Sequence, residues 1–161
     1  MILSLWRHGE AGPAMSDQAR CLTAAGQKVL TSSAERFAEE ARRRGWPLLA
    51  KVKHSPWLRT EQTAGILSRH LACDACEPTA LLAPGAAPEH FLDYQTPEGV
   101  HELWVSHQPF VSRAIAVWCQ EDTIMPLAPG GYAVMQVTSF VPGGAELLWC
   151  QPEPDSGEAD S

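Results

Sequence analysis

Apolar residues along the chain alternate between short uninterrupted runs and longer spaced patterns. Residues 2–6 are almost all apolar, which is typical of a strand buried on both faces. Residues 23–44 instead place apolar side chains at helical spacing and end in three arginines followed by Gly45, which predicts a helix and its C-terminus. The predicted inner face of this helix consists of Leu30, Ala34, Phe37 and Ala41.

The same two patterns continue through the rest of the chain. Further strands are predicted at residues 48–54, 79–83 and 102–106, and a hairpin at residues 131–140 and 145–150. We expect helices to begin at Ser55-Pro56, with Ser55 as the N-cap, and at Gln108-Pro109, and a short helix near residues 89–94. Because strands alternate with helices, the fold is predicted to be α/β, a three-layer sandwich with a mostly parallel mixed sheet flanked by helices.

Length and charge limit the possible partners. The 161 residues suit one domain, placed here at residues 1–150 and followed at residues 151–161 by an acidic tail that is predicted to be disordered. The formal net charge is −7, and four of the acids lie in that tail. A chain this acidic is a poor binder of nucleic acid or of anionic membranes, so a site for an anion has to be a local pocket.

Neither a signal peptide nor a membrane span is expected. The longest uncharged run, residues 123–145, is broken by several prolines and glycines. Five cysteines without regular spacing favour reduced thiols, so we expect a cytoplasmic protein, and a monomer. His70, Cys73 and Cys76 supply only three of the four ligands of a structural zinc, so no metal is expected there.

Basic residues follow three of the predicted strands. Arg7-His8-Gly9 comes directly after the first strand, Arg59 lies one helical turn after the second, and His107 follows the strand at 102–106. In an open α/β sheet ligands bind beyond the carboxyl ends of the strands, so we expect these residues to converge. Arginine forms bidentate hydrogen bonds with phosphate oxygens. Histidine can act as a nucleophile, as an acid–base group or as a further hydrogen-bond donor. The pattern indicates a phosphate-bearing ligand.

Four motifs carry a resemblance to a known family: Arg7-His8-Gly9-Glu10, Arg20-Cys21-Leu22-Thr23-x-x-Gly26, Ser55-Pro56-x-x-Arg59-Thr60-x-Gln62-Thr63 and Val105-Ser106-His107. With them the chain resembles the histidine phosphatase superfamily, which includes the phosphoglycerate mutases. The short length and the second motif resemble the SixA-type phosphohistidine phosphatases in particular. The resemblance covers residues 1–151, and Cys21 stands where the family commonly has proline. It implies a phosphoglycerate mutase-like fold.

The resemblance also implies a reaction that uses neither a metal nor another cofactor. His8 would attack the phosphoryl group in line and become a phosphohistidine, which water then hydrolyses. Arg7, Arg59 and His107 would hold the phosphoryl oxygens, where charge sits in the transition state.

Gly9 and Arg20 complete the expected phosphate site. Gly9 would let the backbone turn sharply beside the phosphate. Arg20 would add a cation to the pocket, and an ion pair with Asp17 or Glu10 is the alternative role for its guanidinium. His54, at the end of a predicted strand, is expected to pack rather than to react.

Three functions remain open at this stage. The favoured one is a phosphatase that acts on phosphohistidine of a signalling protein, such as a phosphotransfer domain. The second is a small-molecule phosphate monoesterase of the same superfamily, and the third is a non-catalytic module that binds phosphorylated ligands. Ester-cleaving members supply a carboxylic acid to the leaving oxygen, usually after the third strand, where this chain offers only Glu89.

Overall fold

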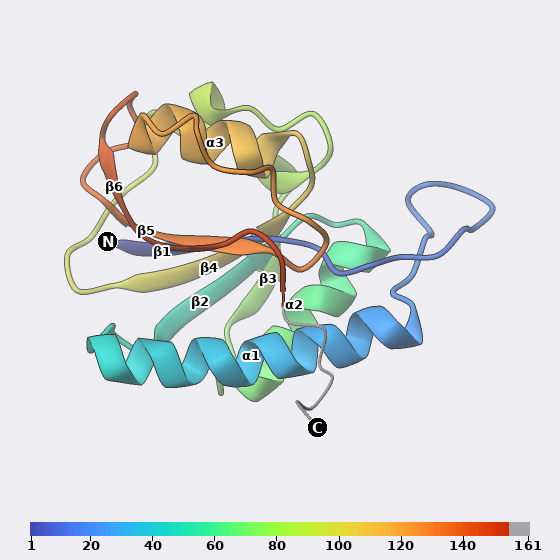
Figure 1. The fold of residues 1–161 in the computed structure, drawn as a ribbon. Helices are drawn as coiled ribbons and strands as arrows, with labels where there is room; N and C mark the ends of the chain where they lie inside the picture. Colours follow the sequence, from blue (N-terminus) through green and yellow to red (C-terminus); the bar gives the residue numbers. More distant parts are fainter. Residues whose placement is uncertain (155–161) are drawn as a thin grey trace.

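Six strands form one sheet in the order β3-β2-β4-β1-β5-β6 in the computed structural model, which describes residues 1–154 (Figure 1). The strands are β1 (Ile2–Arg7), β2 (Leu49–His54), β3 (Cys76–Pro78), β4 (His101–Ser106), β5 (Tyr132–Val137) and β6 (Ala145–Gln151). The helices are α1 (Ala24–Arg44), α2 (Leu58–His70) and α3 (Phe110–Cys119), with the 3₁₀ turns η1 (Ala80–Leu82) and η2 (Pro88–Phe91). Strands β3, β2, β4 and β1 pair in parallel, whereas β5 and β6 are antiparallel. The predicted mixed, mostly parallel sheet is confirmed.

Helices cover both faces of this sheet, which explains the uninterrupted apolar run of β1. Helices α1 and α2 lie on one face and α3 on the other (Figure 1). Side chains alternate along a strand, so Ile2 and Trp6 pack towards α1 and α2, while Leu3 and Leu5 pack in the core beneath α3. A strand enclosed in this way has no polar face, and its sequence contains no polar alternation.

Helix α1 begins and ends where the sequence predicts. Thr23 is its N-cap, and its Oγ1 accepts a hydrogen bond from the Gly26 N–H at 2.9 Å. Gly45 terminates it with φ 70°, a left-handed conformation that favours glycine. The three arginines of the last turn lie at the negative end of the helix dipole.

Two predicted elements are wrong in detail. The strand expected at residues 79–83 lies at β3 instead. The Thr79 N–H still donates to the His54 carbonyl at 2.8 Å, but the Thr79 side chain caps η1, and the chain turns there so that Leu82 packs into the core. The second helix begins at Leu58 with Trp57 at the N-cap position, so Ser55 is not its N-cap. Ser55 is fully buried and has a different partner, described below.

The C-terminal boundary is also later than expected. Gln151 belongs to β6, and the Pro152 carbonyl accepts a hydrogen bond from the Ala128 N–H at 2.9 Å. The rest of the predicted tail, residues 155–161, lies outside the described residues. Across residues 1–154, the helices are too short or too polar to cross a membrane.

Candidate active site

Three neighbouring strands bring the predicted site residues to one edge of the sheet. Strands β2, β4 and β1 are adjacent and parallel, so their carboxyl ends lie side by side. His8 follows β1, His107 follows β4, and Arg59 lies in the first turn of α2, which follows β2. The ring centroids of His8 and His107 are 5.3 Å apart, and Arg59 Nε lies 3.3 Å from His8 Nε2. Residues about 50 positions apart in the chain therefore meet at one point.

His8 is held as a neutral imidazole with one nitrogen free to react. Its Nδ1 lies 2.8 Å from the Gly9 carbonyl oxygen, which can only accept, so Nδ1 carries the proton and Nε2 the lone pair. Burial lowers the pKa of His8 to about 4, the bond to Gly9 opposes this shift, and the charges of Arg59, Arg7 and Arg20 add to it. At neutral pH the unprotonated Nε2 is available for attack on an electrophile.

His107 is the second buried imidazole of the site. Its Nε2 lies 2.8 Å from Ser55 Oγ, and its Nδ1 is buried without a hydrogen-bond partner in the described part of the chain. Burial, followed by the charges of His8 and Arg59, lowers the pKa of His107 to about 3. This ring is therefore also neutral at pH 7.

The two arginines lie close enough to influence each other. Burial and then the charge of Arg59 lower the pKa of Arg7. Arg7 Nη1 donates to the Leu127 carbonyl at 2.9 Å, whereas its Nε is buried without a partner among residues 1–154. Two guanidinium groups that repel each other favour an anion bound between them, and a phosphoryl group has both the charge and the oxygen geometry for that place.

Asp17 contacts Arg59, which the sequence did not predict. It lies in the long loop between β1 and α1, where its carbonyl accepts from Arg59 Nη1 at 2.7 Å and its Oδ2 lies 3.2 Å from Arg59 Nη2. Desolvation is the largest single contribution and raises the pKa of Asp17, but the hydrogen bond and charge of Arg59, and then those of Arg20, together lower it below its usual range. The spacing of Asp17 and Arg20 predicted their ion pair, but no local pattern predicts a contact 42 residues away.

Arg20 has structural partners in the loop between β1 and α1. Arg20 donates to the Gly12 and Ala11 carbonyls at 3.0 and 3.2 Å and to Asp17 Oδ1 at 3.4 Å, so the expected ion pair is present and the guanidinium closes the loop on itself.

Gly9 does not adopt a left-handed backbone, and its N–H donates to Thr63 Oγ1 at 3.1 Å. A Cβ at this position would lie 2.7 Å from Leu30 Cδ1, so close packing against α1, rather than a sharp turn, explains the glycine.

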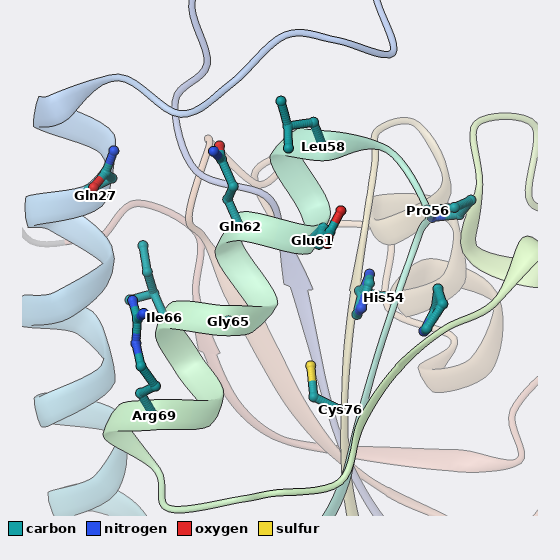
Figure 2. Close-up of a pocket in the computed structure, with 11 residues that line it drawn as sticks. Gln27, His54, Pro56, Leu58, Glu61, Gln62, Gly65, Ile66, Arg69 and Cys76 are labelled. Carbon is teal, nitrogen blue, oxygen red and sulfur yellow. The ribbon is translucent and has the colours of Figure 1, made fainter.

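A groove of about 720 Å³ lies next to this site along α2 (Figure 2). Pro56 and Leu58, directly before Arg59, line one part of it, and Arg69 lines another. His54 also lines the groove, and its Nδ1 lies 2.8 Å from the Ser55 carbonyl. His54 is buried, in agreement with the packing role expected for it.

Glu89, the carboxylate considered as a proton donor, and Glu10, which follows the His8 segment, both have other partners. Glu89 Oε1 lies 3.8 Å from Arg113 Nη2 on an exposed surface, and Glu10 Oε1 accepts from Thr23 Oγ1 at 2.8 Å. Within residues 1–154, three or more histidine, cysteine, aspartate or glutamate side chains never gather in a geometry that could hold a metal ion.

Comparisons with known proteins identify the fold. No family model matches the chain, and no curated protein matches its sequence. Among solved structures, the protein histidine phosphatase SixA in complex with tungstate is 25% identical, with a TM-score of 0.75 over 94% of this chain and 97% of that chain. A protein assigned as a SixA phosphohistidine phosphatase in Agrobacterium tumefaciens is 22% identical, with a TM-score of 0.74 over 92% of this chain and 96% of that one.

A more distant match widens the same group. Phosphoglycerate mutase from Plasmodium falciparum is 15% identical, with a TM-score of 0.60 over 92% of this chain and 88% of that chain. The resemblance read from the motifs is therefore confirmed at the level of the fold: the chain has the α/β architecture of the phosphoglycerate mutase-like histidine phosphatases and is most like SixA among the three structures described.

Proposed function

We propose that this chain, which has the SixA fold, is a metal-independent phosphatase that uses His8 as its nucleophile and removes phosphate from phosphohistidine on a signalling protein. The observation that carries the proposal is the state of His8: a buried, neutral ring whose Nδ1–H is taken by Gly9 and whose Nε2 lone pair faces Arg59. Arg7, Arg59 and His107 surround this nitrogen with donors suited to phosphoryl oxygens.

The reaction has two displacement steps. His8 Nε2 attacks the phosphorus of the substrate phosphohistidine, the substrate P–N bond breaks, and the electron pair leaves with the imidazole nitrogen, which takes a proton from water. A water molecule then attacks the phosphorus on His8, the P–Nε2 bond breaks, and its electron pair returns to Nε2. The attacking water loses a proton to solvent, and inorganic phosphate is released.

The leaving group favours phosphohistidine over an alkyl phosphate. An alkoxide needs a carboxylic acid to protonate it, whereas imidazole accepts a proton readily near neutral pH. Asp17 is the carboxylate bonded to Arg59, and Arg59 keeps its pKa low, so it is ionised and has no proton to donate. Glu89 faces Arg113 on an exposed surface.

Relative rates on three substrates test the proposal. A phosphohistidine-bearing phosphotransfer domain, a phosphoramidate and an alkyl phosphate are compared side by side, with Glu89→Gln as the control variant. We expect cleavage of the first two, negligible cleavage of the third, and rates for Glu89→Gln within about 3-fold of the wild type, because no general-acid contribution of ~10²–10⁴ is lost. Alkyl phosphate turnover as fast as that of phosphohistidine, with a hundredfold loss in Glu89→Gln, would establish the small-molecule monoesterase instead.

A further inference from the structure

Ser55 connects two of the strand ends through a single hydroxyl. It directly follows β2, its side chain is fully buried, and its Oγ lies 2.8 Å from Nε2 of His107. The Trp57 N–H points at the same oxygen at 3.3 Å and can only donate. A hydroxyl can accept two hydrogen bonds, so the Trp57 bond alone does not fix the direction. Within residues 1–154, however, His107 Nε2 is the acceptor within reach of the Ser55 hydroxyl, and a proton on Nε2 would leave this buried O–H without a partner. The arrangement that satisfies every donor has Ser55 donating to Nε2 of His107.

The other nitrogen of His107 is placed to contact the substrate. Its Nδ1 is buried and has no partner in residues 1–154, although leaving a buried polar atom unsatisfied is destabilising. The His8 ring lies at a centroid distance of 5.3 Å, so the His107 ring borders the place where the phosphoryl group would be transferred. A neutral imidazole has only one N–H, and its position decides whether Nδ1 attracts or repels a phosphoryl oxygen.

We propose that Ser55 is a positioning residue: it donates to Nε2 of His107, holds the ring proton on Nδ1, and so makes neutral His107 a hydrogen-bond donor to a phosphoryl oxygen. The identity of the ligand rests on the proposed function, but the tautomer does not.

The molecule contains a complete example of the same arrangement. Ser4 Oγ lies 2.7 Å from Nε2 of His101, and Nδ1 of His101 lies 2.9 Å from the Pro47 carbonyl. Because that carbonyl can only accept, His101 carries its proton on Nδ1 and the serine donates to Nε2. At His107, Ser55 likewise lies at Nε2. A phosphoryl oxygen would accept from Nδ1 there, as the Pro47 carbonyl does at His101.

Burial, with the neighbouring arginines, keeps the His107 ring neutral at pH 7, which is the condition for the tautomer to matter. The groups that influence it are His8, Arg59, Arg7 and Asp17; only the carboxylate favours the protonated ring. Burial makes the largest contribution and lowers the pKa of His107 to about 3. Loss of the serine would leave the ring neutral but free to place its proton on Nε2, with the Nδ1 lone pair towards the phosphoryl oxygen.

Nitrogen NMR of the histidine-labelled full chain at pH 7 tests the tautomer directly. We expect the wild type to show His107 protonated on Nδ1, and Ser55→Ala to show the proton partly or wholly on Nε2. Thr60→Ala is the matched control, because Thr60 Oγ1 donates to the Ser55 carbonyl at 2.8 Å but does not contact His107. It disturbs the same turn and should leave the tautomer unchanged.

Kinetics and anion binding supply the second readout. Ser55→Ala should lower kcat/KM by ~10- to 100-fold and weaken binding of tungstate, used as the phosphate-like probe, and neither effect should appear when Ser55→Ala is added to His107→Ala. A wild-type His107 protonated on Nε2 overturns the inference, even if Ser55→Ala fails to fold, and so does an undiminished effect in the His107→Ala background. Failure of every phosphorylated substrate alongside the expected tautomer and tungstate binding would instead overturn the proposed function.

Discussion

The two ends of strand β4 carry two buried histidines that differ in one hydrogen bond. His101, at the first residue of the strand, has a serine at Nε2 and a backbone carbonyl at Nδ1. His107, directly after the last residue, has a serine at Nε2 and no partner at Nδ1 among the described residues. Both rings are almost fully buried and both have a lowered pKa. Burial and pKa therefore do not distinguish His101 from His107, the one proposed to bind the phosphoryl group, but the unsatisfied nitrogen does.

The surroundings of the two rings explain this difference. His101 packs among Phe37 and Trp46 near the start of the strands, with ring centroids 5.9 and 6.3 Å away, where every polar atom must find a partner within the protein. His107 lies where three strand ends bring two arginines and a second imidazole together. Under the proposed function a phosphoryl ligand would complete the unsatisfied group at this end, and the cost of leaving it unsatisfied in the free protein would favour binding. The following variants are chosen to test this contrast.

The largest effect is expected at the nucleophile. His8→Ala should have no detectable turnover, since it removes the reacting atom. The variant should stay folded, because His8 lies at the strand-end site and not in either hydrophobic core cluster. Rapid quench of a reaction whose substrate carries a labelled phosphoryl group should show acid-labile label on His8 of the wild type and none on the variant. His70→Ala, at an exposed histidine, serves as the control, and full activity in His8→Ala would contradict the mechanism.

Loss of one arginine should have the next largest effect. Arg59→Ala and Arg7→Ala are each expected to lower kcat/KM by at least ~10²-fold, because each removes charge-assisted bonds worth ~3 kcal/mol in the transition state. Arg43→Ala, which breaks an exposed ion pair with Glu40, should leave the rate unchanged. Near wild-type kinetics for Arg59→Ala would mean that the β2 end is not part of the site.

His101→Ala should show the opposite behaviour. It leaves Ser4 Oγ and the Pro47 carbonyl without their partner and opens a cavity, so we expect a loss of about 3 kcal/mol in the free energy of unfolding. Turnover per folded molecule should stay within about 2-fold of the wild type. Urea unfolding and steady-state kinetics measured on the same sample decide the matter, and an unchanged stability would remove the basis for calling His101 structural.

The smallest effect concerns pH. In the unfolded chain His107 titrates near 6.5, and in the folded chain at about 3, so the unfolded state binds more protons between these values and stability falls as the pH drops through this window. Between pH 6.5 and 5.5 this residue should account for about 1 kcal/mol of the loss. His107→Ala should therefore lose correspondingly less stability over that interval, and an equal loss in both proteins would show that the folded-state pKa is near its ordinary value.

Sequence predictions succeeded where the interactions that cause a structure join residues close together in the chain, and failed where they join distant ones. Helix α1 and its caps follow from side chains within a few residues of one another, as do the buried pattern of β1 and the hairpin of β5 and β6. The first helical turn of α2 was misplaced by two residues because Ser55 looks like an N-cap locally, whereas its hydroxyl bonds to a ring 52 residues away. Gly9 illustrates the same limit, since its reason is the distant side chain of Leu30.

The sequence by itself determined the order of strands and helices, the α/β class and the positions of Arg7, His8, Arg59 and His107 at strand ends, because hydrophobic periodicity and motif spacing are properties of the chain alone. Only the tertiary structure decided which nitrogen of His8 carries the proton and which nitrogen of His107 lacks a partner among the described residues. It also decided that Asp17 is bonded to Arg59 and that Ser55 is bonded to His107. Hydrogen-bond partners across the edge of a sheet depend on the strand order β2-β4-β1 and its register, and the position of a proton on an imidazole depends on those partners.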